Sequence, residues 1–154
     1  MLVDERGRQF RIGVYGLAVT DGAVLLARLG PVEAEVGAWT LPGGGLDWGE
    51  HPLEGLEREF VEETGLHPIV LQPLGIHSFV VSSARRKLAG PDIHVAQAVY
   101  LVSARGNPVN EIDGSTDEAE WWPLDRLREV RLVELVEVAL GWFSSLPTPR
   151  PPTG

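Results

Sequence analysis

Four ionisable side chains are concentrated within six consecutive residues. They are Arg58, Glu59, Glu62 and Glu63. In a helix of 3.6 residues per turn the three glutamates stand at positions i, i+3 and i+4, so they share one face. Like charges at this spacing destabilise a helix by roughly 0.2–0.5 kcal/mol, and a cation on the face would offset that repulsion. Carboxylate oxygens are hard ligands, so an all-oxygen set favours Mg²⁺ or Mn²⁺ over Zn²⁺. The alternative is a solvated helix face with i,i+4 ion pairs.

A helix from about Pro52 to Thr64 is expected to position these charges. Proline is tolerated in the first helical turn, and Gly65 suits a left-handed C-cap. His51 is a poor N-cap residue. Gly55 lies in the middle of the helix and costs about 1 kcal/mol relative to alanine, which close packing would explain. An apolar stripe must dock this helix on a sheet and turn the glutamates outward into a cleft. The stripe consists of Leu53, Leu56 and Phe60.

The segment before the helix is rich in glycine. It reads Leu41-Pro42-Gly43-Gly44-Gly45. Neither a helix nor a central strand accommodates this composition well, and glycine lets a backbone turn sharply and approach a ligand closely. We therefore expect a loop here.

The glycine segment and the charged helix are separated by fixed spacings. Gly44 is followed after five residues by Glu50 and, after seven more, by the sequence REFVEETGL from Arg58 to Leu66. This stretch resembles the Nudix box, from Gly44 to Leu66, at every fixed position. Two flanking segments resemble landmarks of the same family more loosely. They are Trp39-Thr40-Leu41-Pro42-Gly43-Gly44 and Trp121-Trp122-Pro123-Leu124.

The resemblance implies a role for each group of residues. It makes Glu59, Glu62 and Glu63 metal ligands together with the backbone of Gly44, with Mg²⁺ as the cofactor and Mn²⁺ as a substitute. Glu62 or Glu63 would also activate water, Arg58 would orient a box carboxylate, and Glu50 would organise the loop.

Two further groups are candidates outside the helix. In several Nudix enzymes the general base lies on a later loop, which makes Asp117, Glu118 and Glu120 candidates, and we choose Glu118. A solvated acidic turn is the alternative for each of them singly. Phosphate contacts are expected from Gly43 and Gly44 and from two arginines, Arg28 and Arg85. For the Arg85-Arg86-Lys87 run the alternative is a solvated hairpin tip.

Alternating and continuous apolar segments predict the remaining elements. Strands are expected over 11–19 and 23–29, joined by a hairpin turn at Asp21-Gly22. An irregular strand over 67–81 would pair with one over 94–103. Trp121-Trp122 would form a short strand after a loop over 107–117, and a helix is predicted over 124–142. Interleaved strands and helices favour an α/β/α sandwich with a mixed central sheet, which the Nudix resemblance also implies.

Composition limits the class of protein. The 154 residues suffice for one domain, which we place at residues 1–145, followed by a Pro-rich flexible tail at 146–154. A formal net charge of −9 disfavours nucleic acid and anionic membrane as partners. Cysteine is absent, which excludes disulfides and thiolate metal sites. Without a recognisable signal peptide or membrane span, a cytoplasmic protein is expected.

These inferences predict metal-dependent hydrolysis of a pyrophosphate linkage in a nucleoside diphosphate derivative. No extended segment precedes the first strand, which favours a compact MutT-like (d)NTP pyrophosphohydrolase. ADP-ribose, other nucleotide sugars and dinucleoside polyphosphates are alternative substrates, and a non-catalytic nucleotide-sensing domain is an alternative function. A homodimer stays open as an oligomeric state.

Overall fold

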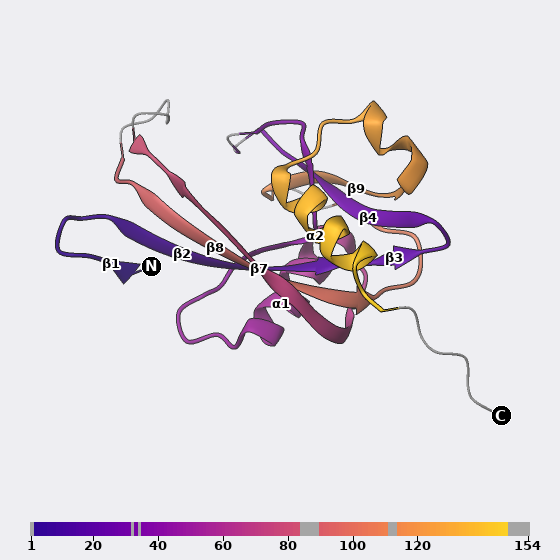
Figure 1. Ribbon diagram of the computed structural model, residues 1–154, viewed down its shortest axis with the longest axis horizontal. Helices are drawn as coiled ribbons and strands as arrows, with labels where there is room; N and C mark the ends of the chain where they lie inside the picture. The colour runs from indigo at the N-terminus through magenta and orange to yellow at the C-terminus, as the bar shows by residue number, and fades with distance from the viewer. Residues whose placement is uncertain (1, 32, 34, 84–89, 111–113, 148–154) are drawn as a thin grey trace.

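The strands of the computed structural model form two sheets, with helices packed against them (Figure 1). The structure describes residues 2–31, 33, 35–83, 90–110 and 114–147. In chain order its elements are β1 (Leu2–Val3), β2 (Gln9–Leu17), β3 (Val19–Thr20), β4 (Ala23–Leu29), β5 (Trp39–Thr40), β6 (Gly43–Gly45), α1 (Pro52–Thr64), β7 (Ile69–Val81), β8 (Ile93–Ser103), β9 (Thr116–Pro123), the 3₁₀ helix η2 (Leu124–Glu129) and α2 (Glu134–Ser144).

The larger sheet is mixed, as expected. Its strands follow the order β1-β2-β8-β7, and β6 pairs with β2. β2 runs parallel to β8, whereas β1, β6 and β7 run antiparallel to their neighbours. β7 is irregular, with register shifts between Val70 and Gln72 and between Pro73 and Gly75. The predicted pairing of this irregular strand with β8 is therefore confirmed.

The first predicted strand is divided between the two sheets. It begins at Gln9 instead of Arg11, pairs in the larger sheet up to Leu17, and continues after Ala18 as β3 in the smaller sheet. The smaller sheet follows the order β3-β4-β5, with β9 paired to β4. Asp21 and Gly22 both have positive φ, of 50° and 74°, as the favoured hairpin turn requires. The Asp21-Gly22 hairpin is confirmed.

The two helices pack on opposite faces of these strands. α1 contributes Leu56 and Phe60 to a buried cluster that includes Val14 and Leu25. α2 contributes to a second cluster that contains Leu17 and the two neighbours of Leu25 in β4. Because alternate residues of a strand point to opposite faces, the two clusters lie on either side of the sheets. Helices cover both faces, as the predicted α/β/α layout requires, although Leu53 of the predicted stripe is 40% exposed.

The predicted helix over 124–142 differs from the structure. A 3₁₀ helix ends at Glu129, and α2 begins only at Glu134. Between them Trp39 donates a backbone hydrogen bond to Arg131 and accepts one from Val133. This pairing with β5 satisfies backbone groups that a continuous helix would use internally, so tertiary structure overrides the helical periodicity.

Three other expectations concern the ends of elements. β9 extends the short strand predicted at Trp121-Trp122 back to Thr116, so Asp117 lies in a strand and not in a loop. The Arg85 run and residues 148–154 of the predicted tail lie outside the described residues. Among the described helices, none has the length and apolar character needed to span a membrane.

Candidate active site

Both ends of α1 are capped by local interactions. Pro52 is the first helical residue, and Nδ1 of His51 accepts a hydrogen bond from the Leu53 backbone N–H at 3.1 Å. The Glu54 carboxylate accepts the His51 N–H in turn, at 3.4 Å. The expectation that His51 caps poorly is therefore wrong, because its ring nitrogen acts as the acceptor that serine or aspartate usually supplies. Gly65 caps the other end with φ of 72°, as predicted.

The glycine segment forms a short edge strand, not a loop. Gly43, Gly44 and Gly45 pair with β2 as β6. A Cβ on Gly43 would overlap the carbonyl oxygen of Val14, and a Cβ on Gly44 would lie 2.7 Å from the carboxyl carbon of Glu59. Glycine is thus required here because another strand and a carboxylate both approach the backbone closely.

Two of the three box glutamates contact this glycine strand. Glu63 is buried, with 2% of its surface exposed, and its Oε2 accepts the Gly43 N–H at 3.0 Å. The carboxylate of Glu59 packs against Gly44. Glu62 is different, because its side chain is 49% exposed. The helix therefore presents one buried, one partly buried and one half-exposed carboxylate.

Arg58 lies at the centre of an ion-pair network. Its Nε and Nη2 each donate to the carboxylate of Glu50 at 2.8 Å, and its Nη1 donates to Glu59 at 2.9 Å. Nη2 also donates to the carbonyl oxygen of Gly45 at 3.2 Å. The guanidinium fork therefore fastens the glycine strand, the loop that follows it and α1 to one another.

The network changes the acid–base properties of its members. The hydrogen bonds from Arg58 lower the pKa of Glu50 from 4.5 to about 2, with help from the Asp47 backbone N–H. The bonds to Glu50 raise the pKa of Arg58 in turn, with a further contribution from Glu59. Glu50 holds the loop in place, which agrees with the role that the resemblance implies.

The donor set around Gly44 suits a hard divalent cation. Glu59, Glu63 and the Gly44 carbonyl supply oxygen only, and the missing side chain at Gly44 leaves the Glu59 carboxylate close to the backbone. Among the described residues, however, no group of three His, Cys, Asp or Glu side chains is arranged to hold a metal ion. Arg58 and the Gly43 N–H already compensate two of the carboxylates, so their charge does not require a metal counterion.

Arg28 and the acids of β9 form a separate group. Arg28 Nε lies 2.8 Å from Asp117, its Nη1 lies 2.9 Å from Glu118, and its guanidinium stacks over Trp39 at 5.8 Å. Arg28 and Glu118 are direct partners across β4 and β9. The structure thus pairs the expected phosphate-binding arginine with the expected general base. Both roles stay predictions, and Arg85 lies outside the described residues.

Residues of β2 that the sequence analysis missed lie beside the glycine strand. The ring of Tyr15 lies over Gly13, and the guanidinium of Arg11 lies over Gly45. Burial raises the pKa of Tyr15, while a hydrogen bond from Gln97 and the charge of Arg11 oppose the shift. The i, i+2, i+4 spacing of Arg11, Gly13 and Tyr15 was the signal that could have found them, because it puts all three on one face of a strand.

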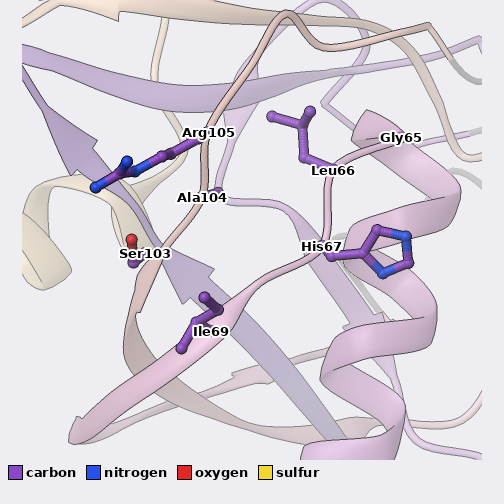
Figure 2. Close-up of a pocket in the computed structure, with 7 residues that line it drawn as sticks. All are labelled: Gly65, Leu66, His67, Ile69, Ser103, Ala104 and Arg105. Atoms are coloured by element: carbon purple, nitrogen blue, oxygen red, sulfur yellow. The ribbon is translucent and has the colours of Figure 1, made fainter.

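A hollow of about 350 Å³ lies beyond the C-terminal end of α1 (Figure 2). It is lined by Gly65, Leu66, His67, Ile69, Ser103, Ala104 and Arg105. Figure 2 shows the side chains of Arg105 and His67 pointing in opposite directions. The hollow therefore gathers no convergent polar groups, and none of the candidate site residues lines it.

Comparison with known proteins places these observations in a family. The family model for the NUDIX domain matches residues 7–142. An RNA pyrophosphohydrolase of Psychrobacter cryohalolentis is 43% identical over 68 residues, which are 44% of this chain and 36% of that protein. An ADP-ribose pyrophosphatase of Methanocaldococcus jannaschii is 33% identical over 118 residues, or 75% of this chain and 63% of that protein. The matched segments thus span less than two thirds of either relative.

The fold agrees with that match. The crystal structure of a MutT NUDIX hydrolase from Burkholderia pseudomallei superposes with a TM-score of 0.73 at 27% identity, covering 87% of this chain and 98% of that one. The matched residues 7–142 include the glycine strand, the Arg58 network and α1. The chain therefore belongs to the NUDIX domain family.

Proposed function

We propose that this protein hydrolyses a pyrophosphate linkage in a nucleoside diphosphate derivative, with Mg²⁺ as cofactor and Mn²⁺ as a substitute. The observation that carries the proposal is the placement of Glu59 and Glu63 against Gly44 and Gly43 by a helix that Arg58 ties to the same strand. Relatives whose names specify pyrophosphate cleavage support the choice of bond.

The side chains of the site have two proposed roles, which are to bind the metal and to accept a proton from the attacking water. Glu59, Glu63 and the Gly44 carbonyl would hold the metal, and Arg58 keeps the Glu59 carboxylate packed against Gly44. When bound, a divalent ion neutralises phosphate charge and acidifies the attacking water. Glu62 is half-exposed and is our first candidate to accept a proton from that water. Glu118 is the second candidate, and its use would require release from Arg28.

The substrate is proposed at two levels of detail. The class is a nucleoside diphosphate linked to another group, and within it we favour a (d)NTP. ADP-ribose is the second candidate because the Methanocaldococcus relative carries that name and matches three quarters of this chain. Triphosphorylated RNA is the third candidate substrate, because the Psychrobacter relative is named an RNA pyrophosphohydrolase. The net charge of −9 opposes binding of such a polyanion.

A substrate panel with matched variants tests the proposal. The purified protein is assayed with Mg²⁺ or Mn²⁺ on dNTPs, oxidised dNTPs, ADP-ribose, nucleotide sugars, dinucleoside polyphosphates and 5′-triphosphorylated RNA. Glu62→Gln keeps the shape of the side chain but removes its basicity, so we expect kcat to fall by roughly 10²–10⁴-fold on the compound that is turned over.

Glu57→Gln is the control, because Glu57 is exposed on the same helix and pairs only with His67 among the described residues. Its kcat should stay within about twofold of the unchanged protein, as expected for a surface substitution. Tight nucleotide binding without turnover of any compound would contradict catalysis and support the sensing function. Equal loss in both variants would show that Glu62 acts only through the helix.

A further inference from the structure

A row of residues crosses the larger sheet next to the candidate site. Gly45, Gly13, Gln97 and His77 are successive register partners in β6, β2, β8 and β7. Register partners project to the same face of a sheet, so these residues form a polar row that starts at the glycine strand. The first two members lack side chains, and Gln97 and His77 are the first polar groups beyond them.

The row begins close to the proposed metal ligands. A Cβ on Gly13 would lie 3.4 Å from the Gly44 carbonyl oxygen and 3.2 Å from the Tyr15 hydroxyl. The backbone of Gly13 is therefore next to both the Gly44 carbonyl and the phenol. The Tyr15 ring and the Arg11 guanidinium lie over the two glycines of the row, so a substrate whose phosphates sit at Gly44 would pass along these two side chains to reach Gln97.

Two polar atoms in the row have no hydrogen bond from the described residues. They are Oε1 of Gln97 and Nε2 of His77, and both atoms are buried. Because Oε1 has no hydrogen-bond partner, the hydrogen bond between Gln97 and Tyr15 uses the amide nitrogen as its donor, and Oε1 remains available. Nε2 of His77 lies 3.4 Å from a carboxylate oxygen of Glu134, at the start of α2. Buried polar atoms without partners cost free energy, which a ligand would recover.

The polar row lies at the edge of the part of the sheet that α2 covers. Trp142 of α2 packs against Gly75. Gly75 pairs with Val99, which lies two residues after Gln97 on β8, so α2 covers the strand positions next to the polar row. On the other side lies Phe79, which is 39% exposed. In Figure 1 the three long strands extend beyond both helices. The polar row thus lies where the cover provided by α2 ends, and the residues Gln97 and His77 are partly buried there.

We infer that Gln97 and His77 recognise the hydrogen-bonding edge of the substrate's nucleobase, with Tyr15 as the positioning residue that fixes the Gln97 amide. Oε1 of Gln97 accepts a hydrogen bond from a ring N–H or exocyclic amino group, and Nε2 of His77 bonds to a neighbouring base atom. This inference rests on the proposed function, because it assumes that the phosphates of the substrate sit at Gly44.

The experiment compares Gln97→Leu with Gln72→Leu on the compounds of the panel. Leucine removes the acceptor, so we expect KM to rise on the order of tenfold, which corresponds to the loss of one hydrogen bond to the base. The preference among bases should weaken, and kcat should change less than about threefold because the reacting groups are untouched. Gln72 lies exposed on β7, beyond Pro73, and its variant should keep the original KM.

Two more variants keep the inference testable if Gln97→Leu fails to fold. Gln97→Glu preserves size but cannot donate to Tyr15, and Tyr15→Phe removes the oxygen that holds the amide. Both should change the ratio of KM values between bases more than they change kcat. Unchanged KM and base preference in every folded variant would overturn the inference while leaving the proposed function intact.

Failure of the proposed function gives a different result. If the unchanged protein binds nucleotides without turnover, Kd is measured in place of KM. The comparison of Gln97→Leu with Gln72→Leu then still tests the role of Gln97. If it neither binds nor hydrolyses any compound of the panel, both the inference and the proposed function are wrong.

Discussion

Single residues determine the chemistry of this protein, and Glu50 shows how. It lies eight positions before Arg58, yet it receives two of the hydrogen bonds that the guanidinium donates. Sequence reasoning placed three glutamates on one helix face, and the resemblance implied that Arg58 orients one of them, but neither identified Glu50 as a partner of Arg58. The reason is physical: the loop after the glycine strand folds back on α1, and helical periodicity carries no information about such a return.

The Glu50–Arg58 pair predicts a pH dependence of stability. The folded-state pKa of Glu50 is about 2, below the ordinary value of 4.5. A depressed pKa contributes stability that is fully present above the unfolded value and is lost as pH falls toward 2. We therefore expect the free energy of unfolding to exceed that of Glu50→Gln by a constant amount above about pH 5 and by a shrinking amount between pH 4.5 and 2.

Urea unfolding of both proteins across this pH range is the measurement. Glu54→Gln serves as a control for the removal of a carboxylate near the start of α1. A difference between the unchanged protein and Glu50→Gln that stays constant down to pH 2 would contradict the lowered pKa.

Elements were predicted best where local rules and tertiary packing agree. The bounds of α1 followed from Pro52 and Gly65, because proline and glycine restrict the backbone regardless of context. The N-cap failed because its acceptor is an imidazole nitrogen, which the usual preference for short oxygen side chains does not cover. The late start of α2 and the length of β9 also failed, since both depend on pairing with β5 and β4.

Helix α1 also predicts the effect of a glycine substitution. Glycine-to-alanine changes inside helices usually stabilise a protein by about 1 kcal/mol. A Cβ on Gly55 would instead overlap Leu46 and lie 2.7 Å from the Glu50 carboxylate, which Arg58 holds in place. We expect Gly55→Ala to lower the free energy of unfolding by about 1–3 kcal/mol through overpacking.

Gly141 provides the matched control in α2, because no atom of the described residues outside the adjoining helix backbone lies within 4 Å of the position of its added Cβ. Gly141→Ala should raise the free energy of unfolding by about 0.4–1 kcal/mol, and urea unfolding measures both variants. Stabilisation of similar size in the two proteins would show that Leu46 and Glu50 move aside at little cost.

At the scale of the whole molecule, the mixed α/β fold was predicted, but its division into two sheets was not. The apolar run around Ala18 reads as one continuous strand, and only its partners show that it leaves one sheet for another. Long-range pairing of this kind has no local signal, which is why the register between Gln97 and the glycine strand was also missed. The candidate site was therefore predicted on α1, the glycine segment, Arg28, Arg85 and Glu118, and not on β2 or β8.

Metal binding should stabilise the entire fold if Glu59 and Glu63 hold a divalent ion. A ligand that binds only the folded state stabilises it by about 2.7 kcal/mol at 100 times its Kd. We expect Tm to rise with MgCl₂ concentration in a thermal-denaturation series. Any salt also screens the repulsion among the charges of a protein with a net charge of −9. A series in NaCl of equal ionic strength is therefore the reference.

The response should depend on the site. Glu59→Gln is expected to lose most of the Mg²⁺-dependent rise in Tm, whereas Glu57→Gln should keep it. An equal rise with NaCl and MgCl₂ would contradict specific binding of the metal.

Strand β2 contributes to both buried clusters. Val14 packs with α1 on one face, and Leu17 packs with α2 on the other. β4 repeats the arrangement through Leu25 and its neighbours. Neither helix can detach without exposing a strand on which its counterpart also depends. Backbone amides of α1 and α2 should therefore exchange their hydrogens through one cooperative opening of the whole domain, instead of through independent fraying of two halves.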